Sequence, residues 1–204
     1  MVRIPLICIL DGIDAWNDIV TTDSKIYYIA FKYYEINGKL LDYIREKHGY
    51  FKSAKLKEFQ SKNKQITNKS PFKWLKIVQN MFKQIVNTIK YLHNKEYYNF
   101  DISLENFIIT QYEPFIHIKF IDLTSAIKHI QNKKLKGRLG GRIQYMSPEK
   151  YSNGFYDGYL SDVYSLGVVL YAILFGKFPY NLPVGTDNLF NYIVIGGNLK
   201  TALN

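Results

Sequence analysis

The sequence predicts a mainly helical α+β fold, and three features indicate it. Apolar residues recur at three- and four-residue spacing between residues 74 and 92, which is the period of an amphipathic helix. Two short apolar runs between residues 107 and 121 are typical of paired strands. The segment from Asp162 to Phe175 is strongly hydrophobic, as in a buried helix. With 204 residues, 47% of them hydrophobic, the chain can form one domain or one large lobe of a bigger domain.

The N-terminal part predicts two strands and the start of a helix. Pro5 to Leu10 and Ile26 to Phe31 are short runs rich in Ile, Val and Tyr, with turn residues near them. Asn37-Gly38 breaks the chain again, and Leu40 to Ile44 then suggests the start of a helix. The lysine-rich stretch from Phe51 to Ser70 predicts a solvated connection, and a nucleic-acid-binding patch is the alternative.

The central part contains the clearest helix of the chain, beginning just after Ser70-Pro71. We expect its apolar stripe to belong to the core rather than to a cofactor site. Strands are expected at Phe107 to Thr110 and at Phe115 to Ile121, with a turn between them. The stripe consists of Trp74, Leu75, Val78, Met81, Phe82, Ile85, Ile89 and Leu92.

The C-terminal part predicts a basic, glycine-marked loop from Lys128 to Arg142 and, after the hydrophobic helix, a further helix within Asp187 to Asn204. The longest apolar stretch, Val163 to Phe175, is shorter than the roughly 20 residues of a membrane span, so no span is expected. The single cysteine, Cys8, excludes an intramolecular disulfide, and a cytoplasmic location is the expectation. A net charge of +10 favours acidic partners without choosing among them.

The candidate chemistry lies at the two ends of the predicted strand pair. Asp101 and Asn106 precede the first strand, and Asp122 follows the second. A hairpin brings its two ends together, so two carboxylates and one amide oxygen can face one cleft. Such a cleft suits Mg²⁺ and a base for a hydroxyl group, which are both needed in phosphoryl transfer. Taken alone, an Asp followed five residues later by an Asn is most often part of a turn or a helix cap, and Asp122 also fits the start of a loop.

An ordered set of motifs resolves this ambiguity, because it resembles the eukaryotic protein kinase family over nearly the whole chain. Asp101 to Asn106, after Tyr91-Leu92-His93, resembles the catalytic loop, and Ile121 to Thr124 resembles the metal-binding triplet. Three later matches follow in the family's order: Tyr145-Met146-Ser147-Pro148-Glu149 at the end of the activation segment, Ser161 to Gly167 at the start of the central helix, and Phe178-Pro179-Tyr180.

The resemblance implies roles residue by residue. Asp101 is similar to the catalytic base, and Asn106 and Asp122 to the ligands of Mg²⁺. The cofactors would be ATP and Mg²⁺, and the partner a protein substrate. Asp162 resembles the buried carboxylate that holds the catalytic-loop backbone, and Glu149 an acid that pairs with an Arg of a later helix. The residues beside adenine would be Phe31, Lys32, Tyr33 and Tyr34.

Several positions depart from the family pattern. Asn99 and Phe100 replace the His-Arg before the catalytic Asp, and Phe cannot bind an activation-loop phosphate. Ser103 replaces the catalytic-loop Lys, and Thr124 replaces the Gly of the metal triplet. Arg142 stands where a Thr is usual, so it either restores the cation lost at position 103 or reflects drift.

We expect residues 1–204 to form a partial kinase domain, with the last strands of the N-terminal lobe and the hinge at 1–36. Residues 37–204 would form a C-terminal lobe that stops before its final helices. No glycine-rich phosphate loop occurs in the sequence, so we expect weak ATP binding and transfer near background by this chain alone.

The function expected from the resemblance is transfer of phosphate from ATP to protein Ser/Thr hydroxyls. A non-catalytic kinase-like interaction module or fragment is the alternative. A small-molecule phosphotransferase would lack the Ser147-Pro148-Glu149 segment, and a nucleic-acid binder rests on charge alone.

Overall fold

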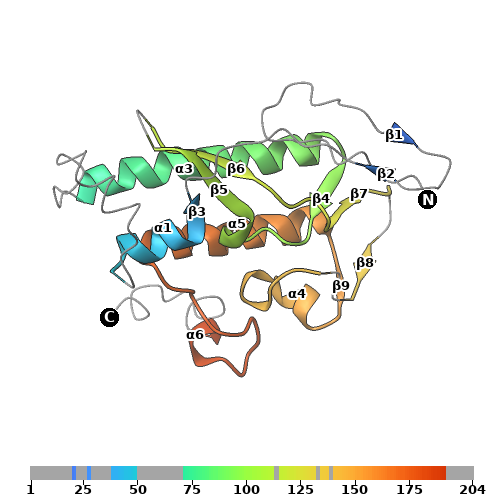
Figure 1. The fold of residues 1–204 in the computed structure, drawn as a ribbon. Coiled ribbons are helices and arrows are strands. Elements are labelled where there is room, and N and C mark those ends of the chain that lie inside the picture. Colours follow the sequence, from blue (N-terminus) through green and yellow to red (C-terminus); the bar gives the residue numbers. More distant parts are fainter. Residues whose placement is uncertain are drawn as a thin grey trace.

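A computed structural model describes residues 20–21, 27–28, 38–49, 71–112, 115–131, 134–137 and 140–191. The strand predicted at Pro5 to Leu10 and the lysine-rich stretch from Phe51 to Ser70 lie outside these residues. In chain order the elements are β1 (Val20–Thr21), β2 (Tyr27–Tyr28), β3 (Gly38–Lys39), α1 (Leu40–Lys47), α3 (Pro71–Asn94), β4 (Tyr97–Asn99), the 3-10 turn η1 (Leu104–Asn106), β5 (Phe107–Gln111), β6 (His117–Phe120), β7 (Ala126–Lys128), β8 (Leu135–Lys136), the 3-10 turn η2 (Ile143–Tyr145), α4 (Pro148–Tyr151), β9 (Phe155–Tyr156), α5 (Gly158–Phe175) and α6 (Asn188–Phe190) (Figure 1).

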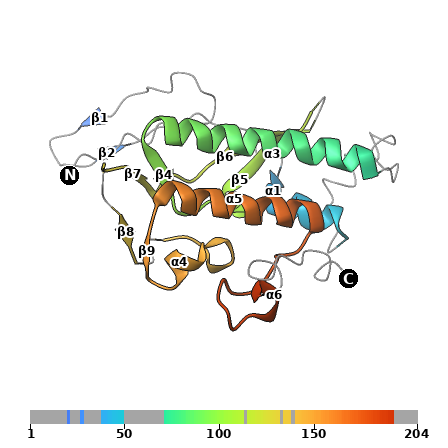
Figure 2. The same ribbon diagram turned by 180° about the vertical axis from the view of Figure 1, so that it is seen from behind.

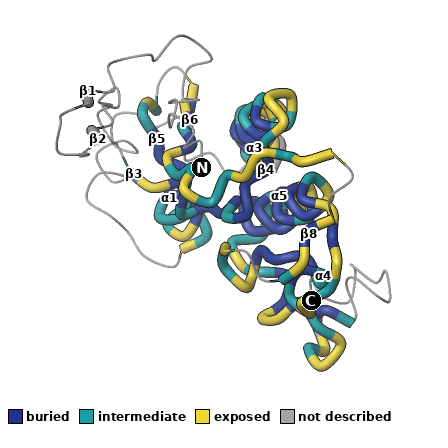
Figure 3. The backbone as a smooth tube through the Cα atoms, turned by 90° about the vertical axis from the view of Figure 1, so that its right-hand side faces the viewer, coloured by how far each residue is buried: buried dark blue, intermediate teal, exposed yellow. Residues whose placement is uncertain are grey.

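Two long helices, α3 and α5, lie side by side and form the centre of the core, as Figure 2 shows from behind. The periodic stripe of α3 supplies Met81, Ile85 and Ile89, which are almost fully buried. Leu75 was expected in this stripe, but its side chain is 50% exposed, whereas the neighbouring Trp74 packs against the core. Burial is concentrated where α1, α3 and α5 meet (Figure 3).

A three-stranded antiparallel sheet, in the order β3-β5-β6, packs beside α3. Gln84 of α3 joins the two elements through its side-chain amide. The amide nitrogen donates to the carbonyl of Ile116 at 2.8 Å, and the amide oxygen accepts from the backbone N–H of Ile118 at 3.1 Å. The buried edge of β6 therefore has hydrogen-bond partners from the helix.

The register of the hairpin positions the residues at its two ends. Phe107 pairs with Phe120, and beyond that pair the N–H of Ile121 donates to the carbonyl of Asn106 at 3.0 Å. The strand ends that carry the predicted polar residues are therefore in direct contact, as the sequence indicated.

Of two further short strands, β7 ends at the start of the segment predicted as a basic loop and β8 lies within that segment. β7 pairs with β4, matching Asn99 with Ala126, and β8 pairs with β9, matching Leu135 with Tyr156. The prediction of a loop from Lys128 to Arg142 is therefore wrong at β8. A two-residue strand has no periodicity of its own and is formed only by its distant partner.

Helix α5 begins four residues before the predicted Asp162, because Asp157 caps it by accepting from the N–H of Leu160 at 3.0 Å. Gly176 ends it in a left-handed conformation with φ of 71°. By length and composition α5 could cross a membrane, but half of it is buried inside the fold, as in a core helix. Of the helix expected within Asp187 to Asn204, the described residues contain only the short α6.

Candidate active site

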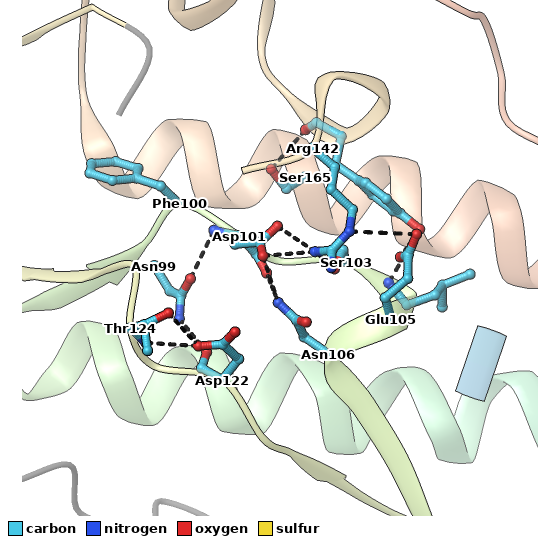
Figure 4. Close-up of polar contacts among 12 residues, drawn as sticks. Asn99, Phe100, Asp101, Ser103, Glu105, Asn106, Asp122, Thr124, Arg142 and Ser165 are labelled. Carbon is cyan, nitrogen blue, oxygen red and sulfur yellow. Dashed lines mark hydrogen bonds and ion pairs between the residues drawn. The ribbon is translucent and has the colours of Figure 1, made fainter. Parts of the chain in front are cut away.

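Asp101 lies in the turn after β4, and its side chain contacts residues from two other segments (Figure 4). The amide nitrogen of Asn106 donates to the backbone carbonyl of Asp101 at 2.8 Å and to its Oδ2 at 2.9 Å. Asn106 is buried, with a relative exposure of 5%. Because its amide nitrogen is engaged by Asp101, the amide oxygen is the atom that remains for a cation.

Asp122 lies at the other end of the hairpin and is oriented by Thr124. The N–H of Thr124 donates to Asp122 Oδ1 at 2.9 Å, and the hydroxyl of the same residue donates to it at 2.6 Å. Within the described part of the chain, Oδ2 accepts no hydrogen bond. Thr124 was noted in the sequence only as a departure from glycine, whereas here it directs one carboxylate oxygen outward.

Asn99 connects Asp101 with Asp122 (Figure 4). Its side chain is fully buried; the amide oxygen accepts from the N–H of Asp101 at 2.8 Å, and the amide nitrogen donates to the carbonyl of Asp122 at 3.0 Å. An amide has one acceptor and one donor end, so a single side chain can fix both turns. The sequence marked Asn99 as unusual but gave no sign of this link.

Arg142 supplies a positive charge to the same place. One terminal nitrogen of its guanidinium, Nη1, donates to both oxygens of Asp101, each at 2.7 Å, and to the hydroxyl of Ser103 at 2.8 Å. Its Nε lies 3.7 Å from an oxygen of Glu105. Asp101 is largely buried, with an exposure of 16%, so this charge-assisted contact is screened less than a surface ion pair.

Asp162 of α5 binds the backbone of the segment that precedes Asp101, as the sequence predicted. This fully buried carboxylate accepts from the backbone N–H of Asn99 at 2.8 Å and from the ring nitrogen Nε2 of His93 at 2.9 Å. Burial raises the pKa of Asp162 to about 6, while the contacts with His93 and Asn99 oppose the rise. The catalytic-loop backbone is therefore anchored to α3 and α5 together.

A second hydrogen-bond anchor comes from Tyr145 of η2. Its hydroxyl donates to Glu105 at 2.9 Å and accepts from the backbone N–H of Leu104 at 3.2 Å. Burial raises the pKa of Tyr145, and the neighbouring Glu105 adds to the rise, so the phenol stays protonated and able to donate. The sequence matched Tyr145 to a motif but did not assign it this contact.

Phe100 points away from the polar cluster. It lies in a small apolar cluster with Tyr98, Leu135 and Tyr156, and its ring centroid is 5.1 Å from that of Tyr98 and 5.9 Å from that of Tyr156. The side chain that replaces a phosphate-binding Arg therefore belongs to a packed core.

The structure brings together Asp101, Asn106 and Asp122, three of the predicted site residues. The four predicted adenine neighbours, Phe31 to Tyr34, lie outside the described residues. Within the residues that are described, no three Asp, Glu, His or Cys side chains form a ready-made metal cage. Mg²⁺ does not need such a cage, because it usually binds one or two protein oxygens and completes its coordination with substrate phosphates and water.

Most of the chain is similar to known proteins. The family model of the protein kinase domain matches residues 11–195. CBL-interacting serine/threonine-protein kinase 17 of Arabidopsis thaliana is 36% identical over 103 residues, which is 50% of this chain and 23% of the relative. Serine/threonine-protein kinase ppk27 of Schizosaccharomyces pombe is 35% identical over 121 residues, which is 52% of this chain and 29% of the relative.

The chain therefore belongs to the protein kinase family. The matches span only about a quarter of the length of these curated relatives. The membership is what the resemblance of the ordered motifs predicted.

Proposed function

We propose that this chain is the catalytic part of a serine/threonine protein kinase that transfers the γ-phosphate of ATP to protein hydroxyls. The described helical body corresponds to a C-terminal lobe. Asp101 orients the acceptor hydroxyl and takes its proton, while Asn106 and Asp122 would hold Mg²⁺. The Ser/Thr class follows the names of the relatives, and residues Phe31 to Tyr34 are proposed to line the adenine.

The observation that carries this proposal is the arrangement around Asp101. The amide nitrogen of Asn106 donates to its carboxylate at 2.9 Å, and the buried Asn99 side chain joins its backbone N–H to the carbonyl of Asp122, so the base and the two metal-ligand candidates lie together. Phosphoryl transfer depends on positioning and on charge stabilisation rather than on covalent participation of the protein. The bound Mg²⁺ would neutralise phosphate charge, and this chain's own part is to orient Asp101 and to supply the cation Arg142 beside it.

The cation at Arg142 changes the expected activity of the chain by itself. The sequence alone suggested transfer near background, since it contains no glycine-rich loop. An ordered base with a neighbouring guanidinium supports slow transfer, with ATP bound weakly.

The test is a titration with magnesium-ATP and a radiolabelled transfer assay on a generic Ser/Thr protein substrate, with Asp101→Asn as the blank. We expect weak nucleotide binding and slow transfer that disappears in Asp101→Asn. Asparagine has nearly the same shape as aspartate, so a loss of transfer in Asp101→Asn reports on the missing carboxylate. Transfer equal in both proteins would contradict the proposal.

A non-catalytic kinase-like interaction module is the second candidate, and one observation favours it. Arg142 contacts both oxygens of Asp101, which leaves this carboxylate fully engaged. If magnesium-ATP does not bind and transfer equals the Asp101→Asn blank, this second function is the better one.

A further inference from the structure

Lys150 of α4 is a buried lysine that neither the sequence nor the proposed mechanism uses. Its side chain is 1% exposed. The ammonium donates to the backbone carbonyl of Phe100 at 3.1 Å and lies 4.5 Å from the centroid of the Phe100 ring. Lysine is rarely fully buried, because removing its charge from water costs free energy that an apolar residue of the same length would not lose.

The surroundings of Lys150 are suited to a cation. The carboxylates of Asp162 and Asp101 favour its charged form, although burial is the larger effect and lowers its pKa to about 8. The lysine therefore still carries its charge near pH 7. The backbone of Gly141 passes close to this contact. A Cβ added at Gly141 would lie 3.3 Å from Lys150 Nζ and 2.1 Å from the Phe100 carbonyl oxygen.

The carbonyl that Lys150 binds belongs to the peptide joining Phe100 to Asp101. The N–H of that same peptide donates to the side chain of Asn99 at 2.8 Å. A peptide is planar, so holding both its oxygen and its hydrogen leaves it no rotation. This plane sets the direction of the Asp101 N–Cα bond and thereby restricts where the Asp101 side chain can lie.

We propose that Lys150 is a positioning residue: its ammonium fixes the Phe100–Asp101 peptide so that the Asp101 carboxylate faces Arg142 and Asn106. The catalytic consequence rests on the proposed kinase function, whereas the orientation of the peptide does not. The lysine acts through the backbone and touches neither substrate nor metal.

A purely structural lysine and a positioning lysine predict different effects of Lys150→Met on hydrogen exchange. Methionine is similar in length and apolar, so it fills the site, but it leaves the Phe100 carbonyl without its donor and removes a cation near Asp162, which costs stability in either case. A positioning role predicts that exchange accelerates mainly at the Asp101 amide. A role in holding the fold together predicts faster exchange throughout the core.

The experiment compares the full chain with Lys150→Met, Lys150→Arg and the control Lys90→Met, which removes an exposed lysine from α3. Urea unfolding measures stability, hydrogen exchange measures the amide of Asp101, and the transfer assay gives kcat and the KM for ATP. In Lys150→Met we expect a lower unfolding midpoint, exchange at Asp101 that accelerates at least tenfold more than at the other core amides, and a kcat about tenfold lower with KM within twofold. Lys90→Met should change none of these values.

Lys150→Arg keeps the charge and should retain exchange at Asp101 within about threefold of the unmodified chain. It decides the question if the methionine variant does not fold. Exchange at Asp101 that is unchanged in Lys150→Met, or equally fast in the arginine and methionine variants, overturns the proposal. A lower midpoint with uniformly faster exchange also overturns it, in favour of a structural role. If the unmodified chain shows no transfer above Asp101→Asn, the kinase function fails, and the exchange data still decide the role of Lys150.

Discussion

At the scale of single residues, the site combines two departures from the family pattern in one contact. Ser103 stands where the family has a cationic lysine, and its hydroxyl accepts from Arg142 at 2.8 Å. The arginine comes from a segment about forty positions further along the chain, yet its guanidinium contacts both the Ser103 hydroxyl and the Asp101 carboxylate. The contact supports compensation rather than drift.

Removing Arg142 should therefore lower transfer without unfolding the chain. We expect Arg142→Ala to reduce kcat about 100-fold, as is typical when one group that stabilises transition-state charge is lost. Ser103→Lys in the Arg142→Ala background should restore part of the rate, because it returns a cation to the same carboxylate. Steady-state transfer kinetics of the single and double variants provide the measurement.

The matched control is Ser103→Lys alone, which would crowd two cations beside Asp101 and should not raise the rate. Full activity in Arg142→Ala would show that the arginine restores nothing and that its position is drift.

At the scale of elements, the activation segment is held by packing rather than by a phosphate. Phe100 and Leu135 share an apolar cluster, and β8 pairs with β9. No Ser, Thr or Tyr occurs between Ala126 and Gln144, where an activating phosphosite would be expected. The described residues of this segment are therefore held by contacts that the unmodified chain already contains.

Activity should accordingly be independent of activation-loop phosphorylation. Treatment of an active preparation with a broad phosphatase should leave the transfer rate within twofold, because no phosphate supports the segment. The assay needs a phosphorylated reference kinase, treated in parallel, to prove that the phosphatase acts. A several-fold loss of rate in this chain would refute the prediction.

Gly141 allows the activation segment to pass closely over the catalytic loop. Its φ is +88°, and an added Cβ would lie 2.1 Å from the carbonyl oxygen of Phe100. We expect Gly141→Ala to lower the free energy of unfolding by about 2 kcal/mol or more, since the backbone must move away from the loop. Denaturant unfolding followed by circular dichroism checks this value.

Gly167 offers a control of opposite sign. It lies on the exposed side of α5, and an added Cβ there meets nothing within 4 Å. Gly167→Ala should stabilise the protein by about 0.5–1 kcal/mol, because alanine favours the helix more than glycine does. Equal effects of the two substitutions would contradict the importance of the close approach at Gly141.

At the scale of the whole molecule, Asp162 is the point where the two core helices meet the site. It lies in α5, contacts His93 of α3 and the backbone of Asn99, and is near Lys150 of α4. Its pKa is raised from 3.8 to about 6, mainly by burial. The hydrogen bonds from His93 and from the Asn99 backbone oppose this rise in the pKa.

This raised pKa predicts how stability depends on pH. Between pH 3.8 and about 6 the Asp162 carboxyl keeps its proton in the folded state but has lost it in the unfolded state. The contribution of Asp162 to stability is therefore greatest below pH 3.8 and is lost as pH rises to about 6. Relative to Asp162→Asn, the unmodified chain should lose up to about 3 kcal/mol of stability over this interval and change little above it. Urea unfolding of both proteins at several pH values gives the difference.

Asp42→Asn, on the first turn of α1, controls for the loss of a carboxylate away from this contact. If the unmodified chain keeps the same stability relative to Asp162→Asn from pH 4 to 6, or becomes relatively more stable as pH rises, Asp162 is not protonated in the fold.

The sequence by itself determined the parts of this protein that depend on local geometry. The three- and four-residue spacing between Trp74 and Leu92 predicts α3, because such residues share one face of a helix. The two runs after Asn106 predict the β5–β6 hairpin, and the closing of any hairpin brings Asn106 and Asp122 to adjacent ends. Family membership followed from the order of the motifs, which is also a property of the chain alone.

Only the tertiary structure decided which distant residues complete the site. That Arg142 restores the cation lost at position 103 was an open hypothesis, whereas its contact with Asp101, the burial of Lys150 and the pairing of β8 with β9 had no signal in the sequence. Such contacts join segments far apart in the chain, so neither periodicity nor spacing encodes them. They depend on how α4 and the activation segment pack against the catalytic loop. A charged side chain can be buried there only because that packing supplies its partners.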